Sequence, residues 1–169
     1  MTGMDTLDRA WAAAARVVDP ELPMLTLIDL GVLRDIAVDD DGAVVAAITP
    51  TYSGCPAMAA MRDDLLREFQ DAGLQDARVR VALEPAWTTD WITPEGRAAL
   101  ATAGISPPGA APRRSGPVAI SLLPTRRAVH CPQCGSADVE LSSEFGSTAC
   151  KAMYRCRTCL EPFDHVKEI

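Results

Sequence analysis

The sequence lacks any apolar run approaching the roughly 20 residues that span a bilayer, and its start, MTGMDTLDRAW, lacks the features of a secretory signal. We therefore expect a soluble, cytoplasmic protein with no membrane partner. In that reducing compartment, the six cysteines indicate metal binding or thiol chemistry rather than structural disulfides.

Positive charge and aromatic residues are also scarce. The chain has 16 Lys and Arg against 23 Asp and Glu, a net charge of -7, and 5% aromatic residues. Nucleic-acid binding depends on clustered cations and stacking rings, so a nucleic-acid partner is disfavoured and protein partners are expected.

Several well-known catalytic motifs are missing as well. The sequence has no Ser-His-Asp set, P-loop, dinucleotide-binding motif or Glu-x-x-His diiron motif. It therefore offers no active site to rival one built from its cysteines.

The chain does contain enough apolar residues, 48% of 169, for one ordinary domain followed by a small module. Apolar residues at helical spacing predict a helix over 7–18, which ends at the turn-rich DPELP. The turn DDDG between residues 32–38 and 43–49 predicts a hairpin of two antiparallel strands.

A second helix is predicted from Pro56, which suits a first helical turn, to Gly73, which ends the helix. Its buried face would consist of Met58, Met61, Leu65 and Phe69. A third strand is predicted over 77–83, where apolar and basic residues alternate as in a sheet with one buried face. The fold class expected for this part is α/β, of the α+β type, with a compact helix-hairpin-helix-strand order.

Beyond this part, the segment TPE predicts the start of a short helix that reaches about Ala103. The next segment begins rich in Pro, Gly and Ser, which indicates a linker, and it contains PVAISLL as one candidate strand. We expect a first domain over 1–104, the linker over 105–124 and a cysteine module over 125–169.

Two C-x2-C knuckles, CPQC and CRTC, lie 21 residues apart in this module. Such spacing is close to the pattern that holds tetrahedral zinc, because each knuckle presents two thiolates from a tight turn. We predict a single metal ion held by Cys131, Cys134, Cys156 and Cys159. Four thiolates leave no open coordination position, so the ion would stabilise a small zinc ribbon and perform no chemistry.

Other interpretations of the module stay open. Four thiolates also suit iron, in a rubredoxin-like centre or a cluster, and zinc is preferred on base rate only. Four free cysteines are a further alternative. Cys150 lies outside both knuckles and is expected to be a buried small side chain rather than a ligand or a reactive thiol. His130 and His165 are expected to be exposed to solvent or to lie around the metal ligands without binding the metal.

The sixth cysteine, Cys55, stands where a strand and its loop run into the second helix. The positive end of that helix dipole is expected to lower the pKa of the thiol, which favours a nucleophile or a soft-metal ligand. The alternative is that Cys55 simply caps the second helix and packs in the fold, without any chemical role. One thiolate is too few to hold a cluster, so a site would be completed by a second copy of the chain or by Asp19, Glu21, Thr51 and Asp90.

A second notable loop holds Trp87 and Trp91 on either side of Asp90. It is either an exposed partner-binding loop or a lid that packs on the domain core, and packing is the commoner fate of tryptophan.

Several motifs together resemble one family. DPELP and DLG, then TYSGCPA and PAWTTDWITPEGRAAL, and finally CPQCGS with STACKAMYRCRTC and EPFDHVK resemble the PaaD family. Its members belong to the phenylacetyl-CoA 1,2-epoxidase system, also called phenylacetate-CoA oxygenase, in which the family is also known as PaaJ. The resemblance covers nearly the whole chain, and the first domain is similar to the iron-sulfur assembly family that includes SufT.

The resemblance implies roles for particular residues. It identifies Asp19, Pro20 and Glu21 as an acidic motif, Thr51 and Cys55 as a T-x-x-x-C motif, and the four knuckle cysteines as metal ligands. It implies an accessory protein of phenylacetate catabolism that is neither the diiron catalytic subunit nor the flavin reductase, and so is itself noncatalytic.

The expected task is maturation. The protein would bind iron or an iron-sulfur cluster transiently through Cys55, as a homodimer where a second cysteine is needed, and deliver it to another subunit, especially the iron-sulfur flavin reductase. The alternative is a permanent noncatalytic subunit that stabilises the epoxidase complex without handling metal.

Overall fold

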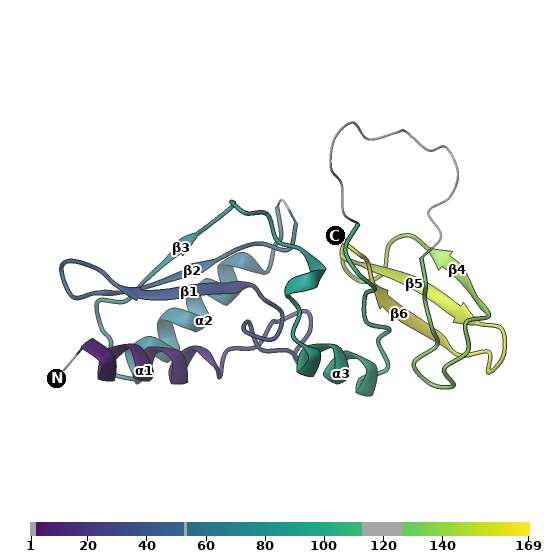
Figure 1. The fold of residues 1–169 in the computed structure, drawn as a ribbon, viewed down its shortest axis with the longest axis horizontal. Helices are drawn as coiled ribbons and strands as arrows, with labels where there is room; N and C mark the ends of the chain where they lie inside the picture. Colours follow the sequence, from purple (N-terminus) through teal and green to yellow (C-terminus); the bar gives the residue numbers. More distant parts are fainter. Residues whose placement is uncertain (1–2, 53, 113–126) are drawn as a thin grey trace. The chain divides into compact units, whose positions relative to one another are not determined.

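A computed structural model describes residues 3–52, 54–112 and 127–169. The chain forms two compact units (Figure 1). The first unit comprises the chain up to Trp87 together with Trp91–Gly96, and the second, here the ribbon unit, comprises Thr88–Asp90 and Arg97–Ile169. Helices and two small sheets are mixed along the chain, which confirms the predicted α/β class. No helix among the described residues is long and apolar enough to cross a membrane.

Helix α1, Gly3–Ala14, opens the first unit and buries its alanine-rich side, including Ala10, Ala13 and Ala14. The predicted helix end at residue 18 is wrong. Tighter i to i+3 hydrogen bonds follow Ala14, and Val18 pairs with Thr26 in an isolated bridge, so the chain has left the helix by then.

The predicted hairpin is confirmed as β1, Leu33–Val38, and β2, Val44–Ile48, which pair antiparallel. Gly42 in the connecting turn has a φ of 83°, a left-handed conformation that glycine adopts without steric cost. Strand β3, Arg78–Val81, then pairs parallel with β2, so the sheet order is β1-β2-β3. As an outer strand, β3 is mostly exposed and lacks the buried face that its alternation predicts.

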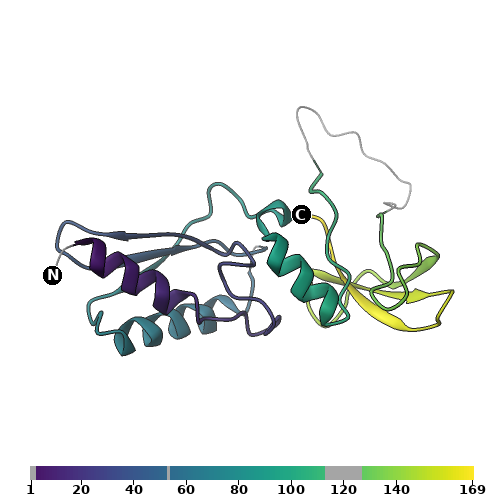
Figure 2. The ribbon, with the colours of Figure 1, turned by 60° about the horizontal axis from the view of Figure 1, so that its bottom comes forward.

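Helix α2, Met58–Asp71, crosses over between β2 and β3. The apolar spacing predicts three of the four inner residues correctly, since Met61, Leu65 and Phe69 are fully buried, whereas Met58 is only half-buried. Both α1 and α2 cover one face of the sheet, as the two views agree (Figures 1 and 2). The core of the first unit therefore lies between this helix pair and the inner side chains of β2.

Helix α3, Pro94–Thr102, begins in the first unit and continues in the ribbon unit. The ribbon sheet has three antiparallel strands in the order β4, Val139–Ser143, then β5, Lys151–Cys156, then β6, Pro162–Val166. Its small core consists of Val129, Cys131, Ala152, Tyr154, Cys156 and Phe163.

The segment expected as a linker, 105–124, is described only to residue 112. Ser106 forms an isolated parallel bridge with His165 of β6 and is buried, so the first residues of this segment pack as part of the ribbon unit. The candidate strand PVAISLL lies outside the described residues.

Candidate metal centre and isolated thiol

The structure closes each knuckle by a tight backbone turn. In the first knuckle, Gly135 donates its N–H to the Cys131 carbonyl at 2.8 Å and has a φ of 73°. In the second knuckle, Leu160 takes the same left-handed conformation, with a φ of 67°, and Cys156 donates its N–H to Glu161. These turns aim two thiols of each knuckle at a shared centre.

The four knuckle sulfurs lie within 4.8 Å of one another. The Sγ atoms of Cys131 and Cys159 are 3.6 Å apart, as are those of Cys134 and Cys156. A tetrahedron with metal–sulfur bonds of about 2.3 Å has edges of roughly 3.8 Å, so this arrangement fits a single four-thiolate ion. Backbone N–H groups of Cys159 and Thr158 lower the pKa of Cys156 to about 6, which prepares one thiolate for metal.

The other candidate ligands lie apart from this cluster. Cys150 is buried, with its Sγ 3.0 Å from the Thr148 hydroxyl, as expected for a small packed side chain. His130 is exposed, whereas His165 is fully buried. Across the residues that the structure describes, the four knuckle cysteines are the only convergent group of three or more Cys, His, Asp or Glu.

Cys55 lies in the turn between β2 and α2, beside Gly54, whose φ is 83°. The thiol is buried, and its predicted lowered pKa is wrong. Burial raises the pKa of Cys55, and the carboxylates of Glu21 and Asp19 raise it further. Hydrogen bonds from the Ala57 N–H and the Thr51 side chain oppose the shift without reversing it. Burial and the two carboxylates therefore favour the neutral thiol of Cys55 over its thiolate.

The acidic motif is held by its own backbone. The Oδ1 atom of Asp19 accepts the N–H groups of Glu21 at 2.8 Å and Leu22 at 2.7 Å, and Asp19 is 5% exposed. This side-chain turn fixes the loop that carries Glu21, whose charge acts on the Cys55 thiol. The structure thus brings together Asp19, Glu21, Thr51 and Cys55, which are up to 36 positions apart in the sequence.

The two tryptophans of the WTTDW loop belong to the first unit. Trp87 is 5% exposed and donates its indole N–H to the Leu30 carbonyl at 3.0 Å. The ring of Trp91 is half-buried, with the Arg34 guanidinium 3.4 Å from its centroid. Trp87 is thus a core residue and does not offer its ring to a partner.

Asp90, between them in sequence, belongs to the ribbon unit and is exposed. Its carboxylate accepts the Ala111 N–H at 2.9 Å, so it helps to hold the segment that follows α3.

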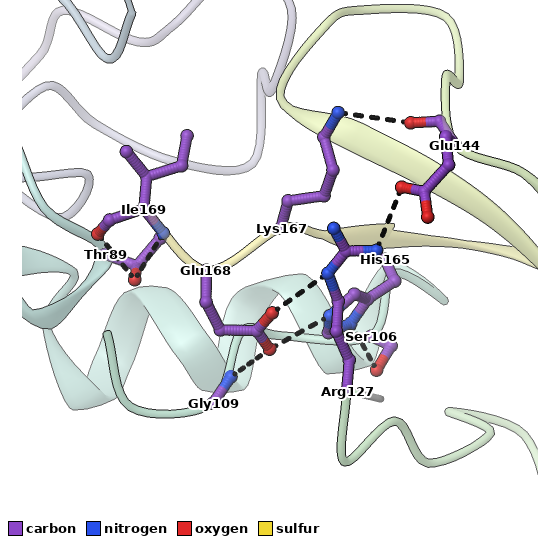
Figure 3. Close-up of polar contacts among 9 residues, drawn as sticks. All are labelled: Thr89, Ser106, Gly109, Arg127, Glu144, His165, Lys167, Glu168 and Ile169. Atoms are coloured by element: carbon purple, nitrogen blue, oxygen red, sulfur yellow. Dashed lines mark hydrogen bonds and ion pairs between the residues drawn. The ribbon is translucent and has the colours of Figure 1, made fainter. Parts of the chain in front are cut away.

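Sequence reasoning missed a buried polar network in the ribbon unit (Figure 3). His165 contacts the Ser106 hydroxyl through Nδ1 at 3.1 Å and the Glu168 carboxylate through Nε2 at 3.2 Å. Glu168 also accepts the Gly109 N–H at 3.0 Å and pairs with Arg127 at 3.4 Å. The HVKE spacing places His165 and Glu168 three residues apart, but nothing in the sequence points to Ser106, which is 59 positions away.

This network has the connectivity of a serine-histidine-acid triad but not its accessibility. Ser106 is 3% exposed, its N–H bonds to Asp164 and its carbonyl accepts from Val166. A nucleophile must reach its substrate, and this hydroxyl is sealed inside the fold. The network therefore fastens residues 105–109 and Arg127 to β6.

Replacing Glu168 with glutamine tests the network. Although burial opposes ionisation, hydrogen bonds from His165 and Gly109 hold the pKa of Glu168 at about 2, below its ordinary 4.5. A carboxylate with a depressed pKa stabilises the fold above about pH 4.5, and this contribution is lost as the pH falls towards 2. At pH 7 we expect Glu168→Gln to lower the free energy of unfolding by on the order of 2 kcal/mol.

Glu140→Gln is the matched control, because Glu140 forms an exposed pair with Arg157 that should be worth less than about 1 kcal/mol. Urea unfolding of all three proteins between pH 7 and pH 3 gives the comparison, with metal content measured in each sample because thiolates release metal in acid. The difference between the wild type and Glu168→Gln should begin to shrink as the pH falls below about 4.5. A difference that stays constant over this range would contradict the assignment.

Two parts of the chain match known families. Residues 115–167 match the family described as "PaaD zinc beta ribbon domain", and residues 7–83 match "Iron-sulfur cluster assembly protein". The first match contains all four knuckle cysteines, and the second contains Asp19, Glu21, Thr51 and Cys55.

Curated relatives agree with this division. The chain is 45% identical over 157 residues, 93% of its length and 90% of the relative, to an Escherichia coli K12 protein that is provisionally named as the D component of 1,2-phenylacetyl-CoA epoxidase. Over about half of its length it is 32% identical to two proteins named Fe-S protein maturation auxiliary factor. These are YitW of Bacillus subtilis, covered over 86%, and SufT of Staphylococcus aureus, covered over 96%.

A solved structure shares the fold of the first unit. It is titled as a domain of unknown function, DUF59, from Bacillus anthracis, with a TM-score of 0.52 at 23% identity over 57% of this chain and 92% of the other. At this identity the likeness concerns the fold alone.

Proposed function

Because the chain belongs to the PaaD family of phenylacetyl-CoA epoxidase components, we propose that it is a noncatalytic maturation factor of that epoxidase system. Its role is associated with the epoxidase and related to iron-sulfur assembly. In our proposal it binds iron or an iron-sulfur cluster transiently at Cys55 and helps to insert it into a partner subunit in the cytoplasm. The iron-sulfur flavin reductase is the client we favour.

The observation that carries the proposal is that the charges of Glu21 and Asp19 act on the thiol of Cys55 in an iron-sulfur assembly-type unit. Carboxylates that disfavour a bare thiolate favour a cation at the same place, because a bound cation neutralises both kinds of charge. The Ala57 N–H and the Thr51 side chain would then orient the thiolate towards its cargo.

The raised pKa of Cys55 also fits a transient carrier. Without cargo the thiol stays protonated, and a protonated thiol resists oxidation. Cationic cargo displaces the proton of the thiol when it binds. A fall in pH or a competing thiol can therefore release the cargo again. A second copy of the chain would supply the second thiolate that a cluster needs.

The ribbon has a different task in this proposal. Zinc is the ion we assign to the four knuckle cysteines, where it would hold the ribbon together and leave no position for substrate. Iron bound at Cys55 and zinc bound in the ribbon are then separable by metal analysis.

Anaerobic reconstitution with ferrous iron tests the proposal on wild type, Cys55→Ser and the matched control Cys150→Ser. We expect zinc to stay at one per chain in all three proteins. Retained iron should fall in Cys55→Ser alone. Loss of a residue that only hydrogen-bonds to a metal ligand lowers metal affinity roughly 10- to 100-fold, and we expect loss of the ligand itself to lower iron affinity at least as much. Cluster content of the reductase, matured together with each variant, should fall in parallel. Normal iron retention and normal cluster loading with Cys55→Ser would overturn the assignment.

The name of the Escherichia coli relative, which describes a component of the epoxidase itself, favours a second candidate, a permanent noncatalytic member of the complex. Adding and omitting this chain with already matured partner subunits separates the two. Full epoxidase activity without it supports maturation, and activity that requires it stoichiometrically supports the structural role.

A further inference from the structure

Among the described residues, no strand pairs with the outer edge of β3 in the first unit. Strand β3 is the outer strand on the side of the sheet opposite β1 (Figure 1). Val81 is 52% exposed and Leu83, just beyond the strand, is 64% exposed, the largest exposures among the described large apolar residues of this unit. An unprotected strand edge with apolar side chains is a template for another strand.

The hydrogen-bonding groups on this edge follow from the pairing with β2. Ala82 donates its N–H to the Ile48 carbonyl at 2.8 Å, towards β2. Backbone groups alternate in direction along a strand, so those of Arg78 and Arg80 also point to β2. The N–H and C=O groups of Val79 and Val81 therefore point outward, ready to pair with an added strand.

The side chains of β3 divide between the two faces of the sheet. Val79 and Val81 share the helix-covered face, since their partners Ala46 and Ile48 are fully buried there. Arg78 and Arg80 lie on the opposite face. Arg78 is paired with Asp41 at 2.6 Å and with Asp39 at 3.5 Å, whereas the described residues contain no ion pair of Arg80. Arg80 therefore places a positive charge on this edge of a chain whose net charge is -7.

A second copy of this chain is a poor occupant of the edge. Antiparallel pairing of two β3 strands about a two-fold axis must place residues of the same face opposite each other. If the axis passes through Val79, Arg78 faces Arg80 twice, and if it passes through Arg80, that residue faces itself. An axis through Val81 avoids both contacts, but it pairs residues 82–84, which lie beyond the end of β3. Like charges directly opposite destabilise a sheet, so the arginines act against self-pairing in the registers centred on Val79 and Arg80.

We propose that β3 is a docking strand for an extended segment of another protein in which acidic and apolar residues alternate. The segment would add to Val79 and Val81 through main-chain hydrogen bonds. Its acidic side chains would lie beside Arg78 and Arg80, and its apolar side chains would extend the helix-covered face over Val81. The docking residues do not include Cys55, and the test needs no iron.

The test uses the isotope-labelled full chain and two acetylated, amidated hexapeptides, one alternating glutamate with valine and one alternating lysine with valine. The glutamate peptide should shift the amide resonances of Val79 and Val81 and bind about tenfold tighter than the lysine peptide. Arg80→Glu should reverse this preference.

Val81→Pro isolates the role of the backbone. Its N–H is not used by β2, and an outer strand tolerates proline, so the variant should fold, which its amide spectrum checks. It should bind the glutamate peptide about tenfold more weakly, whereas Val81→Ala, which keeps the N–H, should stay within about threefold of wild type. Equal binding of the two peptides, no amide shift at millimolar peptide, or wild-type binding by a folded Val81→Pro would each overturn the proposal. Concentration-dependent shifts of the β3 amides without peptide would assign the edge to a second copy and overturn it as well.

Discussion

Cys156→Ser is expected to unfold the ribbon sheet while the first unit keeps its fold. The ribbon core has six buried residues, and two of them, Cys131 and Cys156, are themselves members of the metal cluster. So small a core cannot offset the chain entropy lost on folding. A structural zinc ion contributes about 10–16 kcal/mol of binding free energy in zinc-finger peptides, so we expect that losing one of four thiolates removes the dominant stabilising interaction of the ribbon.

The expected change is measured by amide spectra and metal content of the full chain. Resonances of Tyr154, Phe163 and Val166 should lose their dispersion, zinc should fall well below one per chain, and resonances of β1 and β2 should be unchanged. Cys150→Ser is the matched control, since Cys150 is equally small and buried but outside the cluster. Native dispersion of the ribbon resonances in metal-free Cys156→Ser would show that the ribbon folds without a metal.

The second large effect is expected from Gly31→Ala in the first unit. Gly31 is buried with a φ of 73°, and an added Cβ would lie 2.6 Å from the Cβ of Trp91 and 2.7 Å from its carbonyl oxygen. The clash is with backbone that cannot move aside locally. A left-handed alanine costs roughly 1–2 kcal/mol, and the clash with Trp91 adds to this cost. We therefore expect Gly31→Ala to lower the free energy of unfolding by at least about 4 kcal/mol.

Gly42→Ala is the control that isolates the clash. Its φ of 83° imposes a similar backbone strain, yet nothing lies within 4 Å of the position an added Cβ would take. Its cost should therefore stay near 1–2 kcal/mol. Urea unfolding followed by tryptophan fluorescence compares the two variants with wild type. Equal losses would mean that the Trp91 backbone yields and that Gly31 is required for its φ alone.

Features that depend on neighbours in sequence could be predicted well. The hairpin around Gly42, the buried side of α2 and the paired knuckles all follow from local turn chemistry, helical period and ligand spacing. The end of α1 was less predictable, because the apolar period continues to Val18 while the chain has already turned to pair with Thr26.

The sequence by itself determined that four cysteines can meet at one centre, because two C-x2-C turns need only a hairpin between them. Tertiary structure decided the character of Cys55. The helix dipole predicts a lowered pKa, but burial and carboxylates from a loop 34 and 36 positions earlier raise it. Tertiary structure also decided the contact between Ser106 and His165, which are 59 positions apart in the sequence. Desolvation of a side chain and its interactions with distant charges depend on which segments of the chain pack together. The residues next to it in sequence do not determine that packing.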